Sequence, residues 1–159
     1  MRTLVLYYSY SGNTERIARQ ISRELDCDLA ALQTVIPYSD DFDTVVNQSQ
    51  GEIKAGYEPA LKPLDYDPAD YDVVVLGFPV WWYTFAPPVK TLLSGVNWTG
   101  KRVYAFAANA GWLGHSLSDV EKACPGADVR PGLSVRFNES HLVTSQAEID
   151  GWIGQIKEG

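Results

Sequence analysis

A short polar segment near the amino terminus has the residue types of an anion-binding turn. The residues in it that could contact a ligand are Ser9, Ser11, Gly12, Asn13 and Thr14. Their hydroxyl and amide groups can donate hydrogen bonds, and Gly12 lets the backbone turn tightly beside a ligand. An apolar segment precedes this turn and a helical pattern follows it, so its backbone N–H groups would open a helix, whose dipole attracts anions.

The same turn lacks the motifs of two other phosphate sites. It contains no lysine, whereas a nucleoside-triphosphate loop needs Gly-Lys-Ser/Thr. It also lacks the Gly-x-Gly-x-x-Gly fingerprint of dinucleotide-binding proteins. A cradle without a positive side chain suits a phosphomonoester held by hydrogen bonds. A capped helix start that follows a strand is the alternative interpretation of these residues.

A second turn, from Pro79 to Phe85, is strongly aromatic. Its candidate ligand-binding residues are Pro79, Val80, Trp81, Trp82 and Tyr83. Neighbours on a strand point to opposite sides, so three successive aromatic side chains cannot all enter one core. Because flat aromatic side chains stack well on a flat heteroaromatic ring, this turn predicts a ring-binding site. Alternatively, two of the three aromatic residues only cover the helix that follows.

A third turn, from Asn109 to Gly114, combines small residues with two glycines. Its residues Asn109, Ala110 and Gly111 could offer backbone amides to the edge of a ring, and Trp112 could stack or contact a partner. His115 comes next, and we interpret it as a polar residue at a helix start rather than as a proton donor.

Strand and helix patterns alternate along the chain. The expected strands are Thr3–Tyr8, Asp28–Val35, Asp72–Phe78, Arg102–Ala108 and Leu133–Val135. Five helices are expected between and after these strands. The first begins at Thr14, the second covers Asp40–Ala55 with Ser39 as its cap, and the third begins at Pro87-Pro88. The fourth covers Ser116–Ala123, and the last begins at a capping box formed by Ser145 and Glu148. Such alternation predicts an α/β domain, 1–159, with a parallel sheet and helices on both faces. The three turns would follow strand ends at one edge of the sheet, where such proteins bind ligands.

The net charge of −7 argues against nucleic acid as a partner, because a phosphate backbone repels an acidic surface. Nine acidic and two basic residues lie in the segment from Ser39 to Asp72, so this segment accounts for the whole net charge of the protein. It could be a solvated flank or a docking surface for a basic partner.

No apolar run approaches the ~20 residues of a membrane span. With no signal-peptide pattern and only two distant cysteines, Cys27 and Cys124, we expect a cytoplasmic protein.

Two segments together resemble the flavodoxin family. They are Tyr7-Tyr8-Ser9-Tyr10-Ser11-Gly12-Asn13-Thr14 and Gly77-Phe78-Pro79-Val80-Trp81-Trp82, the latter typical of a branch with a Pro-x-Trp-Trp second loop. The resemblance implies a three-layer sandwich with a doubly wound five-stranded parallel sheet, order 2-1-3-4-5, and FMN at the switch point. The first turn would hold the phosphate, and the second and third would hold the isoalloxazine. The third turn is poorer in Ser, Thr and Gly than is usual in the family, and the second contains no acid.

The resemblance leaves three functions open. The first is an electron carrier that docks on a basic reductase or acceptor, with Asp40, Asp41 and Asp43 expected near the flavin and Asp65 to Asp72 at the opposite end. The second is an FMN-dependent reductase that uses NAD(P)H and a quinone-like acceptor, with Trp82, Tyr83 and Trp112 walling its substrate space. The third is a non-redox binding module that has lost the flavin. No metal and no catalytic side chain is expected, because the flavin performs the chemistry.

Overall fold

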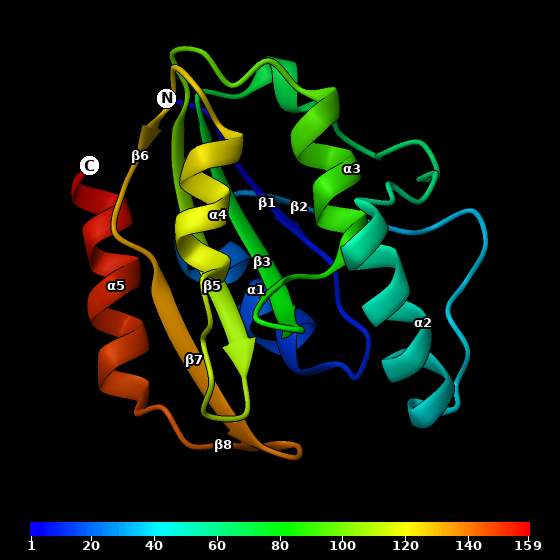
Figure 1. The fold of residues 1–159 in the computed structure, drawn as a ribbon. Helices are drawn as coiled ribbons and strands as arrows, with labels where there is room; N and C mark the ends of the chain where they lie inside the picture. Colours follow the sequence, from blue (N-terminus) through cyan, green and yellow to red (C-terminus); the bar gives the residue numbers. More distant parts are fainter.

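Five parallel strands form the centre of the protein, whose computed structural model describes residues 1–159 (Figure 1). These strands are β1 (Thr3–Tyr7), β2 (Asp28–Ala31), β3 (Val73–Trp81), β5 (Arg102–Asn109) and β7 (Leu133–Asn138). They pair in the order β2-β1-β3-β5-β7, which confirms the predicted 2-1-3-4-5 arrangement. Three two-residue strands bring the total to eight. They are β4 (Thr84–Phe85), antiparallel to β3, β6 (Asp128–Val129), parallel to β5, and β8 (His141–Leu142), antiparallel to β7.

Helices cover both faces of this sheet (Figure 1). They are α1 (Asn13–Leu25), α2 (Phe42–Ala55), α3 (Pro87–Gly95), α4 (Ser116–Ala123) and α5 (Gln146–Glu158), with a short 3₁₀ helix η1 (Pro68–Asp70). Side chains alternate along each strand, so Leu4 and Leu6 enter the core under α3 and α4, while Val5 and Tyr7 enter the core under α1 and α5. None of these helices is both long enough and apolar enough to cross a bilayer.

The middle of the sheet depends on one glycine. Gly77, on β3, lies beside the ring of Phe106 on β5, and a Cβ at Gly77 would be 2.0 Å from the Phe106 Cζ atom. Only glycine therefore lets that ring lie across the neighbouring strand. Phe78, the next residue, is fully buried, and the ligand-binding turn predicted after it begins at Pro79.

The second strand and the second helix differ from the sequence prediction. The second strand ends at Ala31 rather than at Val35, and Thr34 makes only an isolated bridge with Leu61. Beyond it Val35 and Ile36 are exposed, so no packing extends the strand. The second helix begins at Phe42, because the Asp41 carboxylate accepts a hydrogen bond from the Thr44 amide at 3.2 Å and makes Asp41, not Ser39, the N-cap.

Candidate functional site

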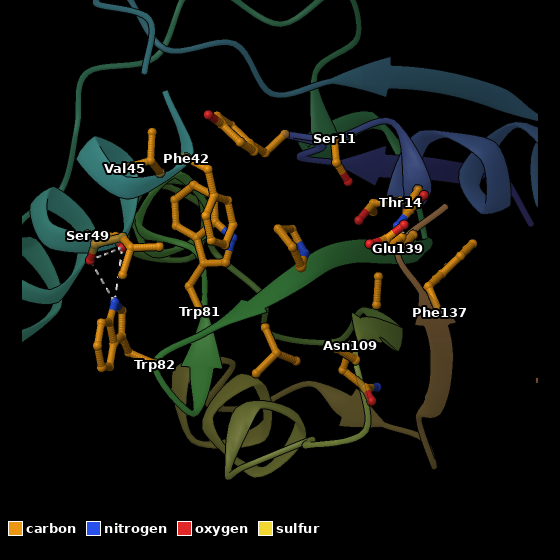
Figure 2. A pocket seen from close by; sticks show the side chains of 17 residues that line it. Ser11, Thr14, Phe42, Val45, Ser49, Trp81, Trp82, Asn109, Phe137 and Glu139 are labelled. Carbon is orange, nitrogen blue, oxygen red and sulfur yellow. Dashed lines mark hydrogen bonds between the residues drawn. The ribbon is translucent and has the colours of Figure 1, made fainter. Parts of the chain in front are cut away.

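A cavity of about 570 Å³ opens at the edge of the sheet where β1, β3 and β5 end (Figure 2). Nine of the thirteen residues that the sequence predicted line it: Ser11, Asn13, Thr14, Pro79, Val80, Trp81, Trp82, Asn109 and Ala110. The other four, which are Ser9, Gly12, Tyr83 and Gly111, belong to the same turns but lie outside its wall. The three turns therefore meet at one cavity, which agrees with their predicted position at strand ends.

The first turn presents hydrogen-bond donors that have no acceptor within the chain. The amide N–H groups of Ser11, Asn13 and Thr14 make no backbone or side-chain hydrogen bond. Thr14 is only 2% exposed, yet its hydroxyl group also has no partner within the chain. Because they lie at the start of α1, where the helix dipole is positive, these free donors form a site suited to an anion.

Ser9 and Gly12 shape this turn rather than line the cavity. The Ser9 Oγ atom accepts hydrogen bonds from the amides of Gly12 at 3.1 Å and Glu15 at 3.2 Å. Gly12 has a φ of 100°, which a residue with a side chain rarely adopts, so the tight turn predicted at this glycine is confirmed.

The second turn is a β-hairpin, which the sequence did not predict. Strand β3 continues past Phe78 to Trp81, and Trp81 and Val80 pair with the two residues of β4. Between them Trp82 and Tyr83 have φ values of 50° and 69°. A two-residue hairpin turn with positive φ at both positions usually contains Asn-Gly, and a left-handed residue with a side chain costs roughly 1–2 kcal/mol. The sequence Trp-Tyr therefore gave no signal of such a turn.

Contacts from two helices hold the strained hairpin in place. The Trp82 indole Nε1–H donates to the Val46 carbonyl at 3.0 Å and the Ser49 hydroxyl at 3.2 Å, both on α2 (Figure 2). On the other side, the His115 amide donates to the Tyr83 carbonyl at 2.8 Å.

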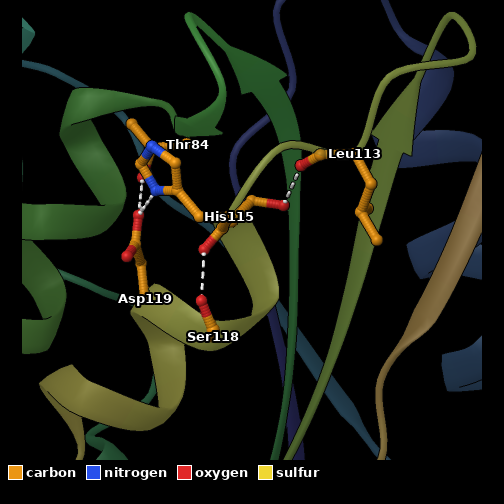
Figure 3. Close-up of polar contacts among 6 residues, drawn as sticks. Thr84, Leu113, His115, Ser118 and Asp119 are labelled. Carbon is orange, nitrogen blue, oxygen red and sulfur yellow. Dashed lines mark hydrogen bonds and ion pairs between the residues drawn. The ribbon is translucent and has the colours of Figure 1, made fainter.

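The start of α4 anchors β4 through one carboxylate. The Thr84 hydroxyl donates to Asp119 Oδ2 at 2.6 Å, and the His115 Nδ1 atom hydrogen-bonds to the same oxygen (Figure 3). His115 is the N-cap residue of α4 and does not line the cavity, which confirms its interpretation as a helix-start residue.

Trp81 is fixed by a cage of tyrosines. The rings of Tyr8, Tyr10 and Tyr38 meet it edge-on, at centroid distances of 5.7, 5.8 and 5.3 Å. The Tyr38 hydroxyl donates to Glu52 at 2.6 Å, and burial followed by this bond raises the pKa of Tyr38 above its ordinary range. Tyr38 therefore keeps its proton, and Trp81 offers the cavity a rigid aromatic surface.

The third turn uses most of its polar groups internally. The Asn109 side-chain amide donates to the Ala107 carbonyl at 3.0 Å and to the Ser134 hydroxyl at 2.9 Å, and its Oδ1 accepts from the Gly111 amide at 2.9 Å. The Gly111 amide is thus already satisfied. Trp112 is 68% exposed and meets Tyr83 edge-on at 5.8 Å, outside the cavity wall.

The cavity wall also contains residues that sequence reasoning missed. They are Tyr10, Phe42, Val45, Val46, Ser49, Ala108, Phe137 and Glu139. The four on α2 reach the cavity only through tertiary packing. The sequence offered a signal at Phe42, a large apolar residue between two aspartates, and 69% of this residue is exposed in the structure. No Lys or Arg lines the cavity, and Glu139 is its only charged residue.

Comparisons with known proteins agree with this geometry. A family model described as Flavodoxin matches residues 2–156. A flavoprotein from Lactobacillus acidophilus NCFM, solved in complex with FMN, is 28% identical, with 95% of this chain and 97% of that chain covered and a TM-score of 0.76. The NMR structure of the apo-form of the flavoprotein from the same organism is 25% identical, with 95% and 96% covered and a TM-score of 0.65.

A more distant structure shows the same fold. Oxidised Flavodoxin 2 from Bacillus cereus is 19% identical, with 99% of both chains covered and a TM-score of 0.59. No curated protein matches the chain. Because the family model spans nearly every residue, this chain belongs to the flavodoxin family.

Proposed function

We propose that this chain binds FMN in the cavity and carries electrons between other proteins. The free amides of Ser11, Asn13 and Thr14, with the hydroxyls of Ser11 and Thr14, would hold the phosphate. Trp81 and Trp82 would border the flat ring. When bound, FMN supplies a group that accepts and returns electrons, and the protein sets its position and surroundings.

One observation carries the assignment of FMN. Unpartnered donors at the start of α1 and a rigid aromatic wall face the same cavity, and no basic side chain lies between them. A phosphomonoester attached to a flat ring fits both ends of such a cavity, whereas a nucleoside triphosphate would need a lysine. The FMN complex of the Lactobacillus acidophilus flavoprotein, 28% identical over 95% of this chain, supports the same ligand.

The charges around the cavity favour a carrier over an NAD(P)H-dependent reductase. Asp41 and Asp43 flank Phe42, which lines the cavity, so two acidic residues lie close to its rim. An acidic rim attracts a basic protein partner and repels a dinucleotide.

Titration with FMN tests the first half of this proposal. The free flavin is fluorescent, and we expect saturable binding of one FMN per chain with quenching by the neighbouring tryptophans. An unchanged flavin emission at a large excess of protein would exclude the site and favour the non-redox binding module.

Electron transfer tests the second half. The chemically reduced holoprotein should pass electrons to a basic haem protein, at a rate that falls as salt screens the acidic rim. Rapid NADPH oxidation with a quinone and no partner protein would instead support the FMN-dependent reductase.

A further inference from the structure

The turn between β7 and β8 brings one acidic side chain to the anion-binding end of the cavity. Glu139 lines the cavity at the end where Ser11 and Thr14 lie, while Trp82 and Ser49 lie at the opposite end (Figure 2). It comes from 126 residues further along the chain than Asn13, and no feature of the sequence linked the two. An acid beside a proposed phosphate site works against the ligand that the site would hold.

The backbone of Glu139 is fixed against the first turn. The Asn13 side-chain amide donates to the Glu139 carbonyl at 2.8 Å, which ties the β7–β8 turn to the start of α1. Glu139 also has a φ of 54°, a conformation that favours Gly, Asn or Asp. Strained backbone that surrounding contacts hold in place is common at ligand sites. The backbone that carries this acid is therefore held beside the first turn.

The Glu139 carboxylate has no partner in the folded chain. It makes no ion pair or side-chain hydrogen bond. On α1, Arg19 is already paired with Glu15 at 2.8 Å, and the Arg136 guanidinium lies against Gly111 in the third turn. A phosphate bound at Ser11 and Thr14 would thus meet a carboxylate that no ion pair holds.

We propose that Glu139 is a specificity-determining residue that limits how much the flavin phosphate contributes to binding. This inference rests on the proposed FMN site. Like charges repel, so the carboxylate weakens binding of the phosphorylated flavin and leaves binding of riboflavin nearly unchanged. Because Glu139 is exposed, water and salt screen the effect.

The test compares FMN and riboflavin in the Glu139→Gln variant, which keeps the size and hydrogen-bonding capacity of the side chain. We expect FMN to bind roughly three- to tenfold more tightly than in the wild type at low salt, and riboflavin affinity to change by less than about twofold. At high salt the gain for FMN should largely disappear, which loss of a merely structural contact would not cause.

A matched control separates the local charge from the net charge. Glu158→Gln makes the same change at an exposed position near the end of α5, where the chain terminus lies close to the start of β5, at the opposite end of the sheet. It should leave the FMN-to-riboflavin affinity ratio unchanged.

Two outcomes would overturn the role of Glu139: weaker FMN binding in Glu139→Gln, or an equal change for both flavins. If the wild type bound neither flavin, the FMN site itself would fall, and the role of Glu139 with it.

Discussion

Polar residues of the first and third turns divide between shaping the cavity and facing a ligand. Ser9 and Asn109 use their side chains to fold the turns in which they lie. Ser11 and Thr14 keep hydroxyl groups without partners in the chain, at the wall of the cavity. The sequence could identify these residue types and their place after strand ends, but it could not assign the two tasks, because a hydroxyl group in a turn can serve either.

Ser11→Glu should abolish FMN binding without unfolding the protein. Ser11 is exposed and makes no side-chain hydrogen bond, so the fold loses nothing, but a carboxylate would occupy the proposed phosphate position. Repulsion at such close range should lower FMN affinity roughly a hundredfold or more. Flavin fluorescence titration measures this loss, and thermal unfolding checks the fold.

Ser94→Glu is the matched control for this change. Ser94 is an exposed serine on α3, outside the cavity wall, and its replacement should leave FMN affinity as it is in the wild type. If Ser11→Glu also bound FMN like the wild type, the first turn would not be the phosphate site.

Among the elements, those with a clear hydrophobic period could be predicted and those made by tertiary contacts could not. Helix α4 occupies the predicted residues, and Ser145 caps α5 as predicted, accepting a hydrogen bond from Glu148. The hairpin after β3 escaped prediction because Trp82 and Tyr83 adopt a backbone that their residue types disfavour. That backbone persists through its contacts with α2 and α4, which no local pattern encodes.

Gly114→Ala should separate the hairpin from the third turn. Gly114 has a φ of 61°, and a Cβ there would lie 2.2 Å from the Tyr83 carbonyl oxygen. The clash must displace the hairpin or the turn, so we expect unfolding free energy to fall by roughly 2 kcal/mol or more. FMN affinity should fall as well, because Trp82 moves with the hairpin. Urea denaturation and FMN titration measure the two effects.

Gly151→Ala supplies the contrasting change within a helix. A Cβ at Gly151 on α5 meets no atom within 4 Å, so the variant should gain roughly 0.5–1 kcal/mol of stability and keep its FMN affinity. Equal stability of the two alanine variants would show that the contact between Gly114 and Tyr83 does not hold the hairpin.

In the whole molecule, the acidic residues of the segment from Ser39 to Asp72 lie at two opposite ends of the sheet. Asp41 caps α2 next to the cavity, whereas Asp72 accepts a hydrogen bond from the Arg2 amide at 3.0 Å, just before β3 begins. The sequence predicted this division from strand direction alone. Only the part near the cavity can guide a partner to a bound flavin, so the total charge overstates the field at the site.

Two cysteine thiols and four tyrosine hydroxyls have raised pKa values in the folded protein. Because these groups are spread over the fold, the loss of stability at high pH is a property of the whole molecule. Burial raises the pKa of Cys124 to about 11, and burial with nearby Asp28 does the same for Cys27. A hydrogen bond to Asp28 raises the pKa of Tyr71 to about 12, and burial raises the pKa of Tyr7, Tyr8 and Tyr38. In every case the folded protein favours the neutral, protonated form.

Stability should therefore be constant with respect to these groups below about pH 9 and fall as the pH rises toward 11 to 12. Above pH 9 the unfolded chain releases its thiol protons while the folded chain retains them. A rise in pH therefore favours the unfolded chain, and the free energy of unfolding falls by about 1.4 kcal/mol per pH unit for each fully shifted group. Urea denaturation across this range measures how steeply the free energy of unfolding falls with pH.

Cys124→Ser removes one titrating group. Between pH 9 and 11 the free energy of unfolding of this variant should therefore fall less steeply than that of the wild type, by roughly the amount given for one group. A wild-type midpoint that stayed level up to pH 11 would show that burial does not hold these protons.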